Sequence, residues 1–304
     1  MGSTLIGHGR AQIRLTAQDA PLTDRPAVDA YMDGDGADQG FALMSDAGTL
    51  RAFVQFAGVA PGMAVVEVGA GTGRLTFEGG LADRVGGEGV LLATDPAPAL
   101  LAVVDRKRRE RRAEHVYTRR AEAEHLPVDP AQAEVVLGSK FLQHCDREAA
   151  VREMRRVCRP GGTVAVLAAV AGGQVPPILG RAIAPLLSAL AAAGASAPDP
   201  YRMYHRAGEV PALFAAAGLE DVRSEPHTEQ AELADPDATM RFCSQLSLLE
   251  GLVEPLPPLT QQILLDRAYT DLRAELERAP RSDRAGSYCW EFVRGRCPLT
   301  PPPA

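Results

Sequence analysis

Residues 65–74 read VVEVGAGTGR, and the fold of the chain follows from this stretch. An apolar run leads into three glycines at alternate positions, Gly69, Gly71 and Gly73, and a helix is expected to begin at Arg74. Glycines at such a turn let the backbone bend sharply and approach a ligand where any Cβ would clash. The pattern predicts a buried strand, then a ligand-binding loop, then a helix.

Strands and helices are predicted to alternate as far as residue 170. The predicted strands cover residues 64–68, 90–94, 134–137 and 163–170, and the predicted helices cover 74–85, 98–112 and 147–157. Gly79 and Gly80 lie inside the first of these helices and cost roughly 1 kcal/mol each relative to Ala, so we expect it to be short or bent. This alternation is typical of a mostly parallel α/β sheet that helices cover on both faces.

The two ends of the chain show other patterns. Residues 1–25 lack periodicity, and we expect a loose arm there. Beyond residue 170, a helix at 207–217 and strands at 222–227 and 287–294 accompany two largely helical stretches, 175–195 and 236–278. We expect the two helical stretches to form a lid over the open end of the sheet. A dimer interface or plain core packing is the alternative for the apolar stretch.

Composition limits the class of protein. The chain has 304 residues, 46% of them hydrophobic, and a formal net charge of -7. An acidic protein repels a phosphate backbone, so no nucleic acid partner is expected. The five cysteines include no C-x-x-C pair, so we expect neither a disulfide framework nor a metal site. The chain shows neither the apolar core of a signal peptide nor a run that spans a bilayer, so we expect a cytoplasmic protein without a membrane partner.

Two carboxylates narrow the choice of ligand. Asp95 ends the second predicted strand, where a carboxylate can accept hydrogen bonds from both hydroxyls of a ribose. Glu67 lies just before the loop, where it would repel a pyrophosphate and attract an ammonium or sulfonium group. The loop reads G-x-G-x-G, which differs from the dinucleotide pattern, and no Gly-Lys-Ser/Thr follows it. A nucleoside with a cationic group is therefore favoured over NAD.

These residues resemble a known family. Residues 67–73, EVGAGTG, are similar to motif I of the class I S-adenosylmethionine-dependent methyltransferases. Residues 121–127, AEAEHLP, resemble that family's stretch around the adenine, and 153–162, ending in RPGG, resembles the turn before its fifth strand. Residues 287–298 resemble its antiparallel last strand. The resemblance covers about residues 45–170 and is strongest to the small-molecule branch that includes the quinone-biosynthesis C-methyltransferases.

The resemblance implies a Rossmann-like, seven-stranded, mostly parallel sheet with helices on both faces, an antiparallel last strand and a helical lid. The implied division is an N-terminal arm and helix at 1–45, a cofactor-binding core at 46–172 and a lid insertion at 173–206. Residues 207–298 would complete the core, with a helical insertion at about 236–278.

The resemblance also implies S-adenosylmethionine as the cofactor. Glu67 would lie near its amino group, Asp95 would hold the ribose, and Glu122, where the family usually has Asp, would reach the adenine amine. The implied cofactor-binding residues are Glu67, Gly69, Ala70, Gly71, Gly73, Asp95, Pro96, Glu122, Ala123 and Ser139.

Four residues are candidates for contacting the substrate or removing a proton from it. His144 follows the fourth strand, and Tyr201, Tyr204 and His205 lie in the loop after the apolar helix, where the family places substrate residues. For each of them, the alternative is a role in local packing or in holding the backbone.

The predicted function is S-adenosylmethionine-dependent methylation of a hydrophobic or aromatic small molecule, such as a secondary metabolite. The main alternative keeps the fold and the cofactor but catalyses a non-methylating reaction, a cyclisation or a pericyclic step. A binding protein with a degenerate site and a nicotinamide oxidoreductase are further alternatives. The substrate, the acceptor atom (O, N or C) and the choice between monomer and homodimer stay open.

Overall fold

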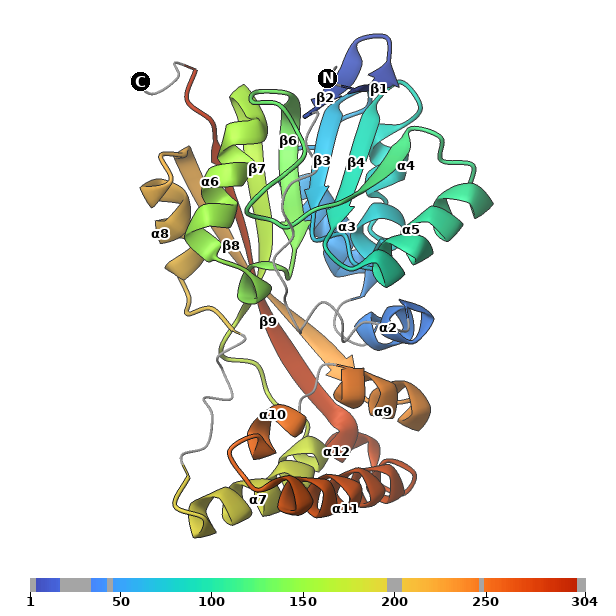
Figure 1. Cartoon of the computed structure of the whole chain (residues 1–304), viewed down its shortest axis with the longest axis vertical. Coiled ribbons are helices and arrows are strands. Elements are labelled where there is room, and N and C mark those ends of the chain that lie inside the picture. The colour runs from blue at the N-terminus through green and yellow to red at the C-terminus, as the bar shows by residue number, and fades with distance from the viewer. Residues whose placement is uncertain (1–3, 17–33, 43–45, 196–203, 246–248, 300–304) are drawn as a thin grey trace.

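A seven-stranded sheet forms the centre of the molecule (Figure 1). The computed structural model describes residues 4–16, 34–42, 46–195, 204–245 and 249–299. The strand order is β5-β4-β3-β6-β7-β9-β8, and β9 runs antiparallel to both of its neighbours. The strands are β3 Ala64–Val68, β4 Val90–Asp95, β5 Val116–Arg120, β6 Ala133–Ser139, β7 Cys158–Val170, β8 Glu220–Glu232 and β9 Ala285–Arg296. The predicted fold class, with its antiparallel last strand, is confirmed.

Helices cover both faces of this sheet, which explains why its central strands are continuous apolar runs. All five residues of β3 are buried; Val65 packs in one hydrophobic cluster and Val66 in the other. One face is covered by α3 Ala47–Phe56, α4 Leu81–Val85 and α5 Pro98–Glu110. The other is covered by α6 Arg147–Val157 and α8 Glu209–Ala216.

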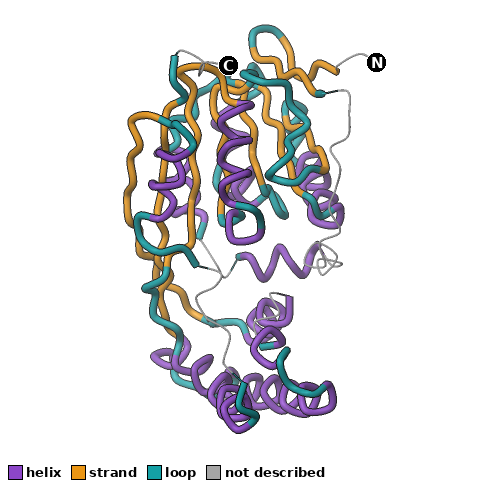
Figure 2. Tube along the Cα trace, turned by 60° about the vertical axis from the view of Figure 1, so that its left-hand side comes forward, coloured by secondary structure: helices purple, strands orange, loops and turns teal. Residues whose placement is uncertain are grey.

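The strands β8 and β9 continue past the rest of the sheet as a two-stranded ribbon. β7 pairs with β9 only as far as Cys289, whereas β8 pairs with β9 as far as Ala285. This ribbon reaches a helical cap that lies beyond the carboxyl ends of the parallel strands (Figures 1 and 2). The cap consists of α7 Pro177–Ala192, α9 Pro236–Gln245, α10 Glu250–Val253, α11 Pro258–Leu276 and α12 Arg281–Arg284.

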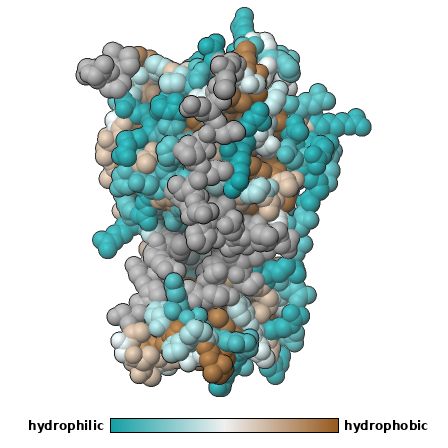
Figure 3. Space-filling view, in the orientation of Figure 1, coloured by the Kyte–Doolittle hydropathy of each residue, from teal (hydrophilic) through white to brown (hydrophobic). Residues whose placement is uncertain are grey.

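The cap has hydrophobic cores of its own. Ile178 packs with Leu272 and Leu276 in one cluster, and Leu186 packs with Val253 in a second. Apolar side chains are also exposed at this end of the molecule, including Leu187, Leu259 and Ile263, and Figure 3 shows brown surface on the cap. The predicted helical lid is therefore present, whereas the domain boundaries stay a prediction.

The structure corrects the prediction for the N-terminus. Residues 4–15 are not a loose arm: β1 Thr4–His8 and β2 Ala11–Leu15 form an antiparallel hairpin. Ile6, Ile13 and Leu15 are buried in the core on the α6 side of the sheet. The alternation of apolar and polar residues in AQIRL was the signal for this strand. The rest of the predicted arm, beyond residue 16, lies outside the described residues.

The break predicted near Gly79 and Gly80 is confirmed. A short π-helix, η1 Arg74–Glu78, ends at Gly79, and α4 begins after Gly80, whose φ of 71° lies in the left-handed region. The edge strand β5 was not predicted; three of the five residues in its sequence, VYTRR, are polar or charged. The helix α2 Gly34–Phe41 lies within residues 1–45, for which an arm and a helix were predicted. None of the helices in the described ranges is long and apolar enough to cross a membrane.

Candidate cofactor and active site

The glycine loop has the conformation that its sequence predicts. Gly69, Gly71 and Gly73 have φ values of 66°, 55° and 80°, in the left-handed region that glycine adopts readily. A Cβ on Gly69 would lie 2.6 Å from the Cβ of Phe141, so any side chain there would clash. The loop therefore presents bare backbone at the carboxyl end of β3.

Glu67 places a buried carboxyl directly before this loop. Glu67 is only 1% exposed. Its Oε2 accepts a hydrogen bond from Thr76 Oγ1 at 2.6 Å. Burial raises the pKa of Glu67 to about 8, and the nearby Asp95 carboxylate adds to the effect. A cation beside this carboxyl would favour its ionised form and lower that pKa. The site therefore fits an ammonium group and not a phosphate.

Asp95 ties the second strand to the glycine loop. Its Oδ2 accepts the Gly71 N–H at 2.8 Å, and its Oδ1 accepts the Ala97 N–H at 2.9 Å. Burial raises its pKa to about 6. Each carboxylate oxygen has two lone pairs, so each can still accept one hydroxyl. Asp95 can therefore accept hydrogen bonds from the hydroxyls of a ribose while it also holds the backbone of the glycine loop.

The remaining predicted cofactor residues lie along the same edge of the sheet. Pro96 follows β4, and the segment 121–126 follows β5 in a tight turn that the His125 N–H closes on the Glu122 carbonyl. Ser139 ends β6, and its Oγ is buried with no hydrogen-bond partner among the described residues. All the predicted cofactor residues thus lie at or after the carboxyl ends of four neighbouring strands, where ligands of α/β sheets bind. Their contacts with a cofactor stay a prediction.

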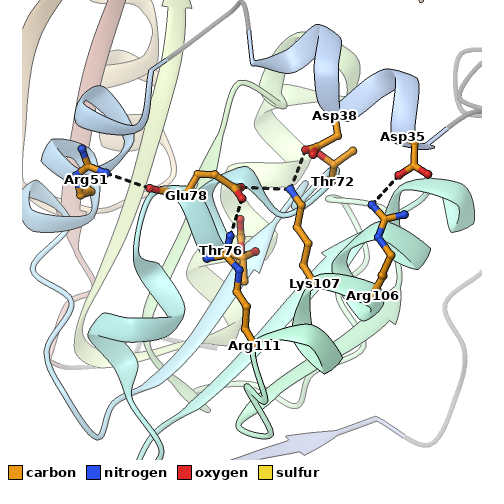
Figure 4. A network of polar contacts seen from close by, with 10 residues as sticks. Asp35, Asp38, Arg51, Thr72, Thr76, Glu78, Arg106, Lys107 and Arg111 are labelled. Carbon is orange, nitrogen blue, oxygen red and sulfur yellow. Dashed lines mark hydrogen bonds and ion pairs between the residues drawn. The ribbon is translucent and has the colours of Figure 1, made fainter.

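The helix α2, which lies within the predicted N-terminal arm and helix at 1–45, packs over the glycine loop. Asp38 accepts a hydrogen bond from Thr72 Oγ1 at 2.6 Å and one from Lys107 Nζ at 2.8 Å (Figure 4). Phe41 comes within 3.6 Å of where a Cβ on Gly71 would lie. The other side of α2 packs against α9 of the cap (Figure 1). This helix therefore connects the loop with the cap.

The predicted catalytic residues do not form one group. Tyr204 packs with the cluster on the α3 side of the sheet. His205 is fully buried beside Glu209 of α8, and its Nδ1 lies 3.8 Å from Glu209 Oε1. Successive residues of an extended segment point to opposite faces, which separates the two side chains. Burial lowers the pKa of His205, so its ring is neutral near pH 7.

The other two candidates are less informative. His144 ends the short 3-10 helix η2 Leu142–His144 at the surface, and partial desolvation of its ring lowers its pKa. Tyr201 lies outside the described residues.

Sequence reasoning missed a cluster that the fold assembles at the base of the ribbon. Lys140 follows β6 with a left-handed φ of 56°, and its Nζ lies 5.4 Å from the centroid of the Trp290 ring. The Trp290 Nε1 donates to Glu229 Oε2 at 3.0 Å, and the Tyr288 ring stacks on Trp290. The one available signal was that Lys140, one of two lysines in the chain, lies three residues after the strand predicted at 134–137.

Burial lowers the pKa of Lys140 to about 7; the charge of Arg74 lowers it further, and Glu229 opposes both effects. Burial also raises the pKa of the Tyr288 hydroxyl, which keeps it protonated. The carboxyl edge of the sheet therefore combines the glycine loop with two half-buried tyrosines, Tyr204 and Tyr288, with the buried Trp290 and with a titratable amine.

Comparison with known proteins agrees with this geometry. Residues 65–162 match the family described as "Methyltransferase domain". A ubiquinone/menaquinone biosynthesis C-methyltransferase of Idiomarina loihiensis is 36% identical over 119 residues, which cover 38% of this chain and 47% of the relative. An arsenite methyltransferase of Halobacterium salinarum is 29% identical over 214 residues, 70% of this chain and 50% of the relative. The chain spans about half the length of these curated relatives.

Solved structures share the fold at low sequence identity. A phosphoethanolamine N-methyltransferase of Haemonchus contortus, solved with S-adenosylhomocysteine, has a TM-score of 0.55 at 15% identity and covers 97% of this chain and 71% of that one. The YcgJ protein of Bacillus subtilis has a TM-score of 0.51 at 17% identity and covers 82% of this chain and 97% of that one. Residues 65–162 are thus similar to a methyltransferase domain, and the strand order and the solved structures show the fold of the class I S-adenosylmethionine-dependent methyltransferases.

Proposed function

We propose that the chain methylates a hydrophobic or aromatic small molecule, with S-adenosylmethionine bound along the carboxyl edge of β3, β4, β5 and β6. The observation that carries the proposal is the pair of buried carboxyls around the glycine loop, Glu67 and Asp95. When bound, the cofactor supplies a methyl group that is already activated by a positively charged sulfur.

The residues of the chain account for binding and orientation. Glu67 would accept the amino group, the open lone pairs of Asp95 would accept the ribose hydroxyls, and the orphaned Ser139 Oγ would gain a partner. The loop backbone would lie against the methionine part of the cofactor, because its glycines leave no side chain in the way.

The half-buried Tyr204 and Tyr288, which lie with the fully buried Trp290 at the base of the ribbon, support an apolar acceptor. Tyr204, Tyr288 and Trp290 lie on the α3 side of the sheet, and the cap lies beyond them. Aromatic walls orient flat molecules and exclude water from the reacting atoms, which strengthens every charge interaction there. The names of the curated relatives include a quinone-biosynthesis enzyme, which is consistent with an acceptor of this kind. A role in secondary metabolism, a cytoplasmic location and a homodimer stay predictions.

The test is calorimetric titration of the purified chain with S-adenosylmethionine, S-adenosylhomocysteine and NAD. We expect micromolar dissociation constants for both sulfur nucleosides, about −8 kcal/mol of binding free energy, and no binding of NAD. Transfer of a labelled methyl group to a panel of phenols, quinols and amines then identifies the acceptor. Binding without turnover of any acceptor would favour the non-methylating alternative, and no binding of either nucleoside would refute the proposal.

A further inference from the structure

We propose that a cavity near the amino ends of the parallel strands binds a phosphate group, either as free phosphate or as part of a small phosphate monoester. The cavity has a volume of about 140 Å³. Its lining consists of Thr163 of β7, Asp221 and Arg223 of β8, and Arg294, Gly295 and Arg296 of β9. It lies at the opposite end of the sheet from the glycine loop, so the inference does not depend on the proposed function.

The strand register brings three arginines together on one face of the sheet. Arg294 and Arg296 are two residues apart on β9, so their side chains point to the same side. Arg223 lies directly opposite Arg294, and Thr163 lies directly opposite Arg296. Like charges that face each other across two strands destabilise a sheet, and an anion between them would offset that repulsion. The register therefore creates a site where a negative charge is favoured.

Two of the guanidinium groups are held in place by the surrounding backbone. Arg294 Nη1 donates to the Phe56 carbonyl at 2.7 Å, and its Cζ lies 5.1 Å from the centroid of the Phe56 ring. Arg296 Nη2 donates to the Gly161 carbonyl at 3.0 Å. A guanidinium has five N–H donors, so each of the two keeps several for a ligand. An anion would thus meet donors that are already positioned, which lowers the entropic cost of binding.

Carboxylates do not neutralise this cluster. Within the described ranges, none of the three arginines forms an ion pair, whereas Arg111 and Arg281 elsewhere in the chain are each paired with a glutamate. Asp221 carries the negative charge in the lining, and Glu220 lies opposite Arg296 in the register without forming an ion pair with it. The cavity therefore has an excess of positive charge in a chain whose formal net charge is -7.

A phosphate group fits this arrangement better than a carboxylate does. Guanidinium groups bind both in a bidentate manner. Three of them together with the Thr163 hydroxyl suit a tetrahedral dianion, which presents three or four oxygens, more than a planar monoanion with two. One water takes about 30 Å³ of liquid, so the cavity has room for an ion of a few heavy atoms. Arg223 and Arg296 are exposed, so the organic part of a monoester would lie in solvent.

The first test is calorimetric titration of the full chain at pH 8 and constant ionic strength. The ligands are inorganic phosphate, glycerol phosphate, dimethyl phosphate and acetate. We expect one site with a dissociation constant of about 1 mM or lower for phosphate, for glycerol phosphate or for both. The two monoanions should bind at least about tenfold more weakly.

The two dianions distinguish the sources of the phosphate group. Binding of inorganic phosphate alone identifies the free ion, and tighter binding of glycerol phosphate identifies a monoester. Equal binding of all four anions would overturn the inference. So would the absence of binding of both dianions at concentrations up to about 20 mM, where a site of the expected affinity would be saturated.

Arg223→Gln tests the site with little risk to the fold, because the Arg223 side chain makes no hydrogen bond or ion pair with the described residues. We expect phosphate affinity to fall at least about tenfold, and Arg296→Gln should give a similar loss. The matched control is Arg152→Gln, which removes the same charge from an exposed position on α6, on the other face of the sheet. Its phosphate affinity should stay within about twofold of the wild type. Equal losses in Arg223→Gln and Arg152→Gln would show that net charge alone attracts the anion and would contradict the assignment.

Thermal unfolding supplies a second readout. Without an added anion, Arg223→Gln should be at least as stable as the wild type, because it removes the repulsion with Arg294. In about 20 mM phosphate, the Tm of the wild type should rise by about 3 °C more than that of the variant. Phosphate also stabilises folded proteins in general by its exclusion from their surface, and the variant measures that general effect. An equal rise of Tm in the two proteins would refute the site.

Discussion

Replacing Glu67 with Gln should remove part of the pH dependence of the chain's free energy of unfolding. The carboxyl is buried, 1% exposed, and its pKa is about 8 against an ordinary 4.5. Gln has the same shape, keeps an oxygen that accepts the Thr76 hydroxyl, and cannot ionise. The variant therefore removes a titration while leaving the packing and the hydrogen bond in place.

The sign follows from the direction of the shift. Because the folded state holds a proton that the unfolded chain releases, this group contributes stability below pH 4.5 that is lost as the pH rises through 8. At about 1.36 kcal/mol per pH unit, the wild type should lose about 3 to 4 kcal/mol of unfolding free energy from this group between pH 5 and pH 8. Asp95, with a pKa of about 6, adds a similar loss at lower pH in both proteins.

The assay is urea denaturation of the cofactor-free chain at pH 5, 6, 7 and 8. We expect Glu67→Gln to match the wild type near pH 5 and to be more stable than the wild type by about 3 kcal/mol at pH 8. Glu277→Gln, which changes an exposed carboxylate on the cap, should run parallel to the wild type. Parallel curves for Glu67→Gln and the wild type would refute the reasoning.

The same carboxyl links cofactor binding to protons. An ammonium group beside Glu67 should lower its pKa, so the wild type should release about one proton on binding S-adenosylmethionine at pH 7. Calorimetry in buffers of different ionisation enthalpy measures this number. Glu67→Gln should release none and should bind the cofactor more weakly. Proton release that is equal in the two proteins would show that the amino group lies elsewhere.

Further predictions concern the loop, the α2 helix and the cap. Asp95→Ala should weaken cofactor binding by on the order of 1–3 kcal/mol in calorimetry, and Asp95→Asn by less, because an amide keeps one acceptor. Asp38→Ala should lower the unfolding free energy by about 1–3 kcal/mol, because Lys107 and the Thr72 hydroxyl each lose a hydrogen-bond partner. The control is Asp35→Ala, which removes an exposed ion pair and should leave the urea denaturation curve unchanged. Leu186→Ala should destabilise the cap by about 2–5 kcal/mol, seen as faster hydrogen exchange there, with cofactor affinity unchanged.

The parts of the molecule that could be predicted are those in which neighbours along the chain set the structure. The glycines at 69, 71 and 73 announce a left-handed turn because no other residue adopts it readily. The glycine pair at 79–80 announces the break between η1 and α4 for the same reason. Apolar runs announced the central strands, since a strand that is buried on both faces needs apolar side chains throughout.

The parts that were missed depend on contacts between distant segments. The strand β5 reads as a polar stretch because it lies at the sheet edge, and its place is set by pairing with β4. The hairpin of β1 and β2 is short, and its buried residues pack on strands far along the chain. Tyr204 and His205 look equivalent in the sequence, but the pairing of this segment beside Val170 sends their side chains to opposite faces.

The sequence by itself thus determines the cofactor loop. The strand, the three glycines and the two carboxylates all lie within one strand–helix–strand unit, so their relative positions follow from residues that are close together in the chain. The position of the amine does not follow from any local pattern. Lys140, Glu229 and Trp290 belong to three strands or strand ends, and they meet only because β9 is inserted antiparallel between β7 and β8. Burial between those strands then lowers the pKa of the amine, because desolvation depends on everything packed around a group and not on its neighbours in the chain.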